Sequence, residues 1–218
     1  STNCVKTLAD NSSHYNCLLN RQGKIDSFFV LTKINSHQFY LWISNEALAR
    51  TLKRLEDYII ADDVELKVNA SKKYYVINRL ALKTQPKDAQ SFIFLMEPTW
   101  LIEKLPSDCE NLPSLLASEI KELYLSRGFY SIDTSVDANQ LLNETIANEI
   151  AWNHDKGCFL GQEVVQKIFT RRGAATYPFA LKIKNKDLIS NQSEIVLKDK
   201  KLIIFGNLTS DDNTRVYT

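Results

Sequence analysis

Short apolar, β-branched runs separated by polar turns dominate the chain, and this pattern restricts the fold more than any other feature. Residues 14–19 and 25–32 flank a turn at 20–23, and another such run covers residues 38–43. Runs of this length with tight turns between them predict antiparallel hairpins. Parallel strands would need a helical crossover between successive runs, and the sequence lacks that alternation. The pattern favours an α+β fold over a Rossmann fold.

Two segments have helical periodicity. Leu48, Leu52, Leu55 and Ile59 recur at the spacing of one helix face, and Ser44 or Asn45 can cap the helix that they predict. This helix is expected to face the core. A second helix is predicted over residues 114–127, closed by Gly128.

Further strands are predicted along the rest of the chain. They cover residues 64–68, 73–82 and 91–96 in the first half, and 177–183, 194–197 and 201–205 near the end. Pro98, Pro106 and Pro113 indicate a less regular stretch between these two groups. The last group, with short strands and polar turns, predicts a small antiparallel barrel or sheet.

The charge balance and hydropathy narrow the range of partners. The chain has 27 basic and 26 acidic residues, a formal net charge of +1. Strong bulk attraction to nucleic acid or to an anionic membrane is therefore not expected. No run approaches the roughly 18 apolar residues of a membrane span, and the first residues do not form a signal peptide. We expect a cytoplasmic protein without direct contact to nucleic acid or membrane.

The four cysteines lie far apart, at positions 4, 17, 109 and 158. Neither they nor the three histidines are spaced like the ligands of a zinc site. We expect reduced thiols, and no metal ion or cluster held by the isolated monomer. Cys4, Cys17 and Cys109 lack neighbours that favour a thiolate and are expected to be structural.

Three of the six glycines, Gly157, Gly161 and Gly173, lie in one short segment that also contains Cys158. Glycines allow a tight backbone, so Cys158 is expected on a turn. Lys156 and a helix that starts near Gly161 would both favour its thiolate. A single cysteine is as often a small buried hydrophobe, so the residues alone leave both roles open for Cys158.

The basic residues after Cys158 also have two interpretations. Lys167, Arg171 and Arg172 can form a solvated helix face or the rim of an anion site, and the solvated face is favoured for each residue alone. Trp152, six residues before Cys158, can be a core residue or an aromatic wall. The core is the favoured role for Trp152.

Residues 156–163 read Lys-Gly-Cys-Phe-Leu-Gly-Gln-Glu, with Lys167 and Arg171 at four-residue steps beyond Glu163. This segment closely resembles the signature of the YgfZ family. Weaker similarity covers most of the chain: residues 2–5 resemble an early Thr-x-Asp-Val segment of the family, and residues 17–24 its first hairpin.

The resemblance implies a fold and a function. YgfZ-family proteins bind folate, are related to the glycine-cleavage T-protein, and act in iron–sulfur cluster assembly or repair. The implied fold is a T-protein-like α+β body over residues 1–174, followed by part of an antiparallel β-barrel over 175–218. The implied role is maturation of iron–sulfur enzymes, tRNA-modifying ones included, with iron–sulfur client or assembly proteins as partners.

The same resemblance implies a site. Cys158 is the expected catalytic residue, and tetrahydrofolate or a derivative is the expected cofactor. Folate would be bound by residues of the motif and its surroundings, namely Trp152, Lys156, Gly157, Gln162, Glu163, Lys167 and Arg171. We expect a folate-shaped cavity near the centre of the first domain, with Cys158 at its mouth and the most reactive of the four thiols.

The chain also departs from the family pattern. Cys4 stands where the family usually has Asp, Arg172 is an additional residue before Gly173, and Ser126 stands where Glu is frequent. The resemblance further implies that the family's opening strand and helix precede Thr2, and that the barrel is incomplete at residue 218.

Two other functions remain open. An aminomethyltransferase of the T-protein type would have paired Asp residues after its hairpin turn, but Ser27 and Phe28 occupy those positions and Asp26 lies one place away. The transferase is therefore disfavoured, and we expect no classical enzyme. A non-catalytic interaction scaffold with a decayed folate site is the second alternative, suggested by Cys4 and by the missing opening segment.

Overall fold

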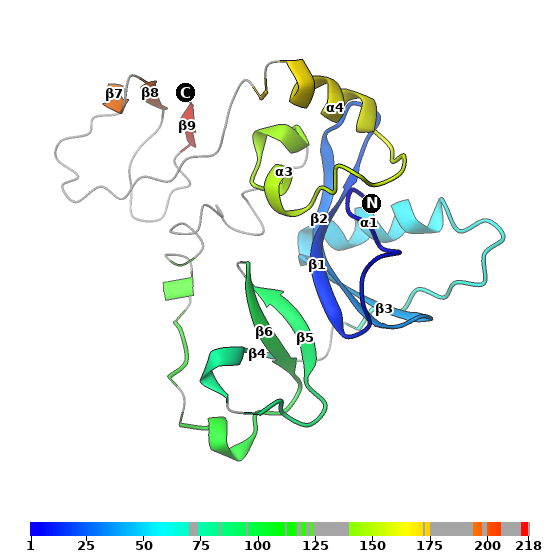
Figure 1. Cartoon of the computed structure of the whole chain (residues 1–218), viewed down its shortest axis with the longest axis vertical. Coiled ribbons are helices and arrows are strands. Elements are labelled where there is room, and N and C mark those ends of the chain that lie inside the picture. The colour runs from blue at the N-terminus through cyan, green and yellow to red at the C-terminus, as the bar shows by residue number, and fades with distance from the viewer. Residues whose placement is uncertain are drawn as a thin grey trace.

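Antiparallel sheets and a few helices make up the structure, which is a computed structural model (Figure 1). The predicted α+β class with antiparallel sheets is therefore confirmed. The structure describes residues 1–69, 74–82, 84–94, 96–111, 113–116, 119–120, 123, 140–171, 173–174, 194–197, 200–205 and 215–217. Within these residues no helix combines the length and the apolar character that a membrane crossing requires.

The first sheet has the order β1-β2-β3, built from β1 (Ser12–Leu19), β2 (Ile25–Asn35) and β3 (Gln38–Ile43). All three strands were predicted, and β2 extends beyond its predicted end. The turn between β1 and β2 closes when the Asn20 N–H donates to the Lys24 carbonyl at 2.9 Å and the Gly23 N–H donates to the Asn20 carbonyl at 3.1 Å. Gly23 has a φ of 75°, which glycine adopts without strain.

The central strand β2 is buried on both faces, because alternate side chains enter two different hydrophobic clusters. Phe28 and Val30 face one cluster, together with Tyr15 and Cys17 of β1. Phe29 and Leu31 face the other cluster. That cluster also contains the buried Leu8 and the half-buried side chains Val5, Leu18, Leu41 and Ile43.

Helix α1 (Asn45–Glu56) packs on β2, and the Ser44 side chain caps it by accepting from the Ala47 N–H at 3.3 Å. The predicted helix and cap are confirmed. Its buried residues, however, are Ala47 and Thr51, whereas the predicted stripe of leucines is half-buried. Small residues at the contact allow the helix backbone to approach the sheet.

The second sheet and the residues before it correct the sequence analysis in three places. Its strand order is β4-β6-β5, with β4 (Tyr75–Asn78), β5 (Gln90–Phe94) and β6 (Glu97–Ile102). The central strand β6 was not predicted, because Pro98 near its start was taken as a break; a proline is tolerated there. The predicted strand 64–68 is wrong: these residues form no strand, and Val64 and Val68 are exposed. A short 3-10 helix, Arg79–Ala81, follows β4 and shortens the predicted strand 73–82.

The two sheets contact each other where β5 lies beside β1. The Ser13 hydroxyl donates to the Ser91 carbonyl at 2.6 Å, and the rings of Trp42 and Phe92 meet edge to face at 5.7 Å. This contact extends the cluster on the Tyr15 face of the first sheet.

Short helical elements cover the same face of the first sheet. They are a 3-10 helix at Leu142–Glu144, α3 (Ala147–Ile150) and α4 (Gln162–Arg171). Leu142, Ala147 and Val165 are fully buried there. Backbone hydrogen bonds from Ile25 to Gln140 and from Leu142 to Gly23 fix this segment to the hairpin. Another 3-10 helix, Ser107–Cys109, lies after β6.

Near the end of the chain, β7 (Glu194–Leu197), β8 (Lys200–Phe205) and β9 (Arg215–Tyr217) pair antiparallel in sequence order. Two of these strands were predicted. The predicted strand 177–183, most of the predicted helix 114–127, Ser126, Gly128 and Arg172 lie outside the described residues. The domain boundary between residues 174 and 175 stays a prediction.

Candidate functional site

A close contact between two glycines places the start of α4 against the first hairpin. Gly161 has a φ of 81°, and a Cβ atom built on it would lie 2.4 Å from the Asn20 carbonyl oxygen and 3.0 Å from the Gly23 backbone. A Cβ on Gly23 would lie 3.2 Å from Val164 of α4. The second glycine of the motif therefore has a structural reason: no larger residue fits between the hairpin and the helix.

Gln162 of the motif shapes the turn before α4. Its side-chain Oε1 accepts from the Phe159 N–H at 3.1 Å, and the Gln162 N–H donates back to the Phe159 carbonyl at 3.2 Å. This reciprocal pair resembles a capping box, which satisfies donors that a helix start leaves free. Cys158 directly precedes this turn and is exposed.

An open depression of about 780 Å³ runs along α4 and brings most of the predicted site residues together. Five of its lining residues were predicted: Cys158, Gln162, Glu163, Lys167 and Arg171. The sequence analysis missed three more, Phe159, Gln166 and Thr170. Their spacing was the available signal, because Gln166 and Thr170 lie at four-residue steps from Gln162 and so share its helix face.

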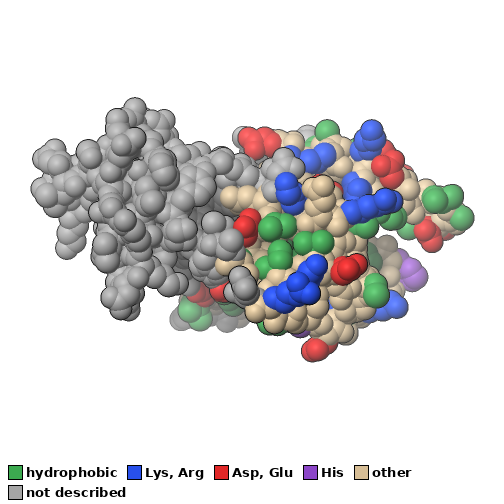
Figure 2. Space-filling view, turned by 90° about the horizontal axis from the view of Figure 1, so that it is seen from above, with side chains coloured by type: hydrophobic (Ala, Val, Ile, Leu, Met, Phe, Trp, Pro, Cys, Tyr) green, Lys and Arg blue, Asp and Glu red, His purple; other side chains and the backbone are tan. Residues whose placement is uncertain are grey.

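The face of α4 that lines the depression has two basic residues, Lys167 and Arg171, and one acidic residue, Glu163. Glu163, Lys167 and Arg171 are all exposed, and among the described residues no ion pair involves them. The face therefore has an excess of positive charge that is free to meet an anion. Figure 2 views the molecule from the end where α4 lies and shows basic, acidic and hydrophobic side chains side by side on that surface.

Lys156 does not line the depression. Its Nζ lies 5.4 Å from the centroid of the Phe159 ring. Partial burial lowers the pKa of the Lys156 ammonium, while its attraction to the sulfurs of Cys4 and then Cys158 acts in the opposite direction. Gly157 does not line the depression either, and a Cβ on it would meet nothing within 4 Å.

Thr2 ties the first residues of the chain to the segment that leads into the motif. Its buried hydroxyl donates to the Ala151 carbonyl at 2.5 Å and accepts from the Cys17 N–H at 2.9 Å. The Asn153 N–H donates to the Thr2 carbonyl at 3.3 Å. As a result the residues next to Cys4 lie against the residues just before Lys156.

Cys4 has polar neighbours that the sequence analysis did not identify. It is partly exposed, and hydrogen bonds from Thr7, followed by a backbone N–H of Lys6 and the charge of Lys156, lower the pKa of its thiol. Cys17 and Cys109, in contrast, are buried, and burial raises the pKa of the Cys17 thiol. Within the described part of the chain, no group of three or more His, Cys, Asp or Glu residues could hold a metal ion.

Trp152 lies in the core rather than in the depression. It is only 5% exposed and belongs to the cluster on the Tyr15 face of the sheet. Its ring meets Phe169 of α4 edge to face at 5.3 Å and lies 3.9 Å from the His154 ring, centroid to centroid. Trp152 therefore packs against the core side of α4 and does not line the depression.

The positions of the expected transferase carboxylates have structural roles. Ser27 is buried, and its hydroxyl is hydrogen-bonded to Thr51 of α1. Phe28 stacks on Tyr15 with ring centroids 5.3 Å apart. Asp26 is the extra residue of a β-bulge and lies 4.0 Å from the Arg54 guanidinium. Asp26 thus forms an ion pair with α1.

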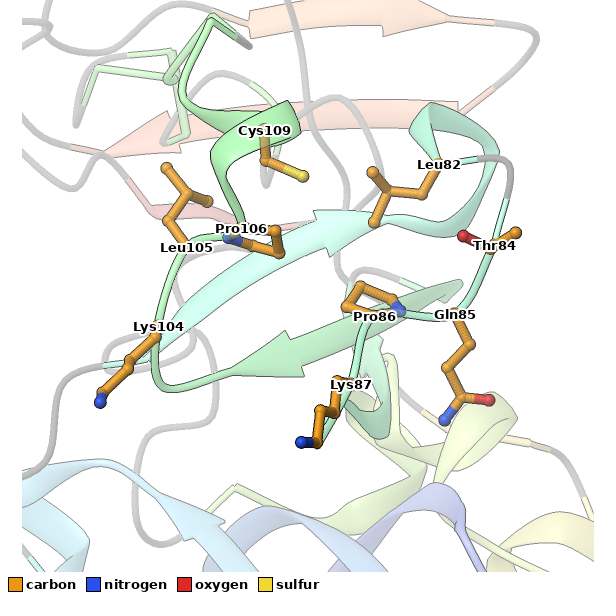
Figure 3. A pocket seen from close by; sticks show the side chains of 9 residues that line it. All are labelled: Leu82, Thr84, Gln85, Pro86, Lys87, Lys104, Leu105, Pro106 and Cys109. Atoms are coloured by element: carbon orange, nitrogen blue, oxygen red, sulfur yellow. The ribbon is translucent and has the colours of Figure 1, made fainter.

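A second depression, of about 400 Å³, lies beside the second sheet. Figure 3 shows Lys87 and Lys104 on one side of it and Leu82 and Cys109 on the other. It contains none of the predicted site residues, so the depression along α4 is the candidate functional site.

Comparison with known proteins gives no family assignment: no family model matches the chain, and no curated protein matches it.

Proposed function

We propose that this chain is a tetrahydrofolate-binding protein of the YgfZ type that acts in iron–sulfur cluster assembly or repair. One observation carries the proposal. The side chains of the family-like motif, Cys158, Gln162 and Glu163, line one depression together with Lys167 and Arg171. A motif that merely stabilised the fold would have no need of so many exposed side chains on one face.

The chemistry of the depression suits a folate. A reduced folate has a flat pterin with amide-like edges, an aromatic linker and a glutamate tail with carboxylates. Lys167 and Arg171 can bind carboxylates, and arginine does so with two parallel hydrogen bonds. Gln162, Glu163 and Gln166 offer donors and acceptors for a pterin edge, and Phe159 offers an apolar surface.

Cys158 is the proposed reactive group, at the end of this face nearest the glycine turn. An exposed thiol can reach the cysteine ligands or the cluster of a client protein, which a buried thiol cannot. Gly161 and Gln162 position the turn that carries Cys158. Gly161 allows the close contact with the first hairpin, and Gln162 accepts a hydrogen bond from the Phe159 N–H in the turn.

The finer fold belongs to the same proposal. The first sheet, with α1 on β2 and α3 and α4 on the Tyr15 face, would be the core of a T-protein-like body. The sheet β7-β8-β9 would be part of the terminal barrel. The proposed partners are folate and iron–sulfur client or assembly proteins.

The geometry disfavours the aminomethyltransferase. That activity needs a carboxylate to stabilise positive charge on the folate amine, and Ser27 and Phe28 fill the expected positions with a buried hydroxyl and a core ring. The carboxylate of Asp26 is already paired with Arg54.

A titration with tetrahydrofolate, followed by calorimetry and by tryptophan fluorescence, tests the proposal. We expect saturable binding that weakens with salt, because the glutamate tail is attracted to Lys167 and Arg171. The double variant Lys167→Glu/Arg171→Glu should raise Kd at least about tenfold, equivalent to about 1.4 kcal/mol.

The matched control is Lys53→Glu/Lys67→Glu, which changes the net charge equally at exposed positions outside α4. Its Kd should equal that of the wild type. Equal weakening in both double variants would mean that binding follows only the overall charge. A wild-type chain that binds no tetrahydrofolate would favour the interaction scaffold instead.

A further inference from the structure

The depression beside the second sheet has an apolar side and a basic side. We propose that this depression, of about 400 Å³ and lined by residues 82, 84–87, 104–106 and 109, binds a small carboxylate with an aliphatic chain. The chain would lie on the apolar wall, and the carboxylate would meet two lysines on the opposite side (Figure 3). The inference does not depend on folate binding.

The apolar wall of the depression belongs to a packed cluster. Cys109 is 1% exposed and packs with the buried Ile77 and Ile102. Leu82 and Leu105 are half-buried and pack against the same cluster. An aliphatic chain on this wall would remove apolar surface from water, and the hydrophobic effect therefore favours its binding.

Hydrogen-bonded turns fix the two segments that form the depression. The Cys109 N–H donates to the Pro106 carbonyl at 2.9 Å, which closes the turn of the 3-10 helix after β6. In the other segment, the Ala89 N–H donates to the Pro86 carbonyl at 3.2 Å, and the Gln85 side-chain amide donates to the Ala89 carbonyl at 3.2 Å. A proline in each segment also restricts φ. The depression is therefore formed before a ligand arrives, and less conformational entropy is lost on binding.

The charged side chains that line the depression are both basic. Lys87 and Lys104 come from the two different segments and are exposed. Figure 3 shows both of them on the side opposite the apolar wall. Among the described residues no ion pair involves either ammonium group. Asp88 and Glu103 are their neighbours in sequence, but neither lines the depression. An anion can therefore meet two ammonium groups without an acidic side chain in the lining to repel it.

The two sides together define the class of ligand. A hydrocarbon would use only the apolar wall, and a small inorganic anion would use only the lysines. A carboxylate with an aliphatic chain uses both, because its oxygens accept charge-assisted hydrogen bonds from ammonium groups. Thr84 and Gln85 add polar groups to the lining. The volume of about 400 Å³ lies within the range of small-molecule sites.

Calorimetric titration of the full chain with octanoate tests the proposal. We expect saturable binding of octanoate. Octanol, which lacks the charge, and acetate, which lacks the chain, should each bind at least about tenfold more weakly. Octanol binding as tightly as octanoate would remove the role of the lysines, and acetate binding as tightly would remove that of the apolar wall. Either result overturns the proposal, as does a chain that does not bind octanoate.

Charge-neutralising variants test the basic side. Lys87→Gln/Lys104→Gln should raise the Kd for octanoate about tenfold, since no cation remains in the lining to meet the carboxylate. The matched control, Lys53→Gln/Lys67→Gln, removes the same charge at exposed positions elsewhere and should leave that Kd unchanged. Equal weakening in both double variants would mean that octanoate responds only to the overall charge, which overturns the proposed site.

Variants of α4 distinguish this depression from the one along the motif. Lys167→Glu/Arg171→Glu should bind octanoate with the wild-type Kd, and Lys87→Gln/Lys104→Gln should bind tetrahydrofolate with the wild-type Kd. Loss of octanoate binding in the α4 variant would place the probe along α4 and overturn the second site. Normal octanoate binding by a chain that does not bind tetrahydrofolate would refute the proposed function and support the second site.

Discussion

Replacing Gly161 by alanine is expected to lower the free energy of unfolding by about 2–4 kcal/mol. Two costs add. Alanine would have to adopt a φ of 81°, in the left-handed region, and its Cβ would lie 2.4 Å from the Asn20 carbonyl oxygen. Because the neighbouring atom is backbone, the hairpin turn or the start of α4 must move. Thermal unfolding should show a fall in Tm of roughly 5–15 °C.

Gly157→Ala is the matched control, since it makes the same chemical change four residues earlier in the motif. A Cβ at Gly157 meets nothing within 4 Å and its φ is not in the left-handed region. Its Tm should stay within a few degrees or rise slightly, because alanine reduces the entropy of the unfolded chain. Equal losses in both variants would contradict the account of the glycine contact.

Replacing Trp152 by alanine is expected to cost about 3–5 kcal/mol of stability. Trp152 is 5% exposed, and its ring supports Phe169 of α4, so the variant leaves a cavity under the helix. Denaturant unfolding measures the loss. Phe169→Ala serves as comparison: that ring is 49% exposed, and its removal should cost clearly less. A Trp152→Ala variant with wild-type stability but no tetrahydrofolate binding would instead make Trp152 a wall of the ligand site.

The hairpins could be predicted from sequence because their determinants are local. Alternating apolar residues and the turn at Asn20–Gly23 specify β1 and β2 without distant contacts. Ser44 marked the start of α1 for the same reason. Strand β6 could not be predicted in this way, because its position between β4 and β5 depends on pairing that outweighs the local effect of Pro98. Residues 64–68 misled for the opposite reason: apolar and charged side chains alternate there as in a strand, but the segment has no partner strand among the described residues.

The candidate site was predictable only along one segment. Residues from Cys158 to Arg171 share the motif and the α4 face, so sequence spacing alone places them together. The contact of Gly161 with Asn20 and the hydrogen bonds of Thr2 with Ala151 and Asn153 join residues far apart in sequence. No local pattern indicates such contacts.

The chemical role of Cys158 is the central claim, and Cys158→Ser tests it most directly. The activity of an iron–sulfur enzyme would be measured in cells that lack the native protein and express either the wild type or the variant, with Tm measured on both purified proteins. We expect the variant to fail to restore activity while its Tm stays within a few degrees, because the exposed Cys158 side chain contributes little packing. Full rescue by the variant, or failure accompanied by a large fall in Tm, would contradict a chemical role for Cys158.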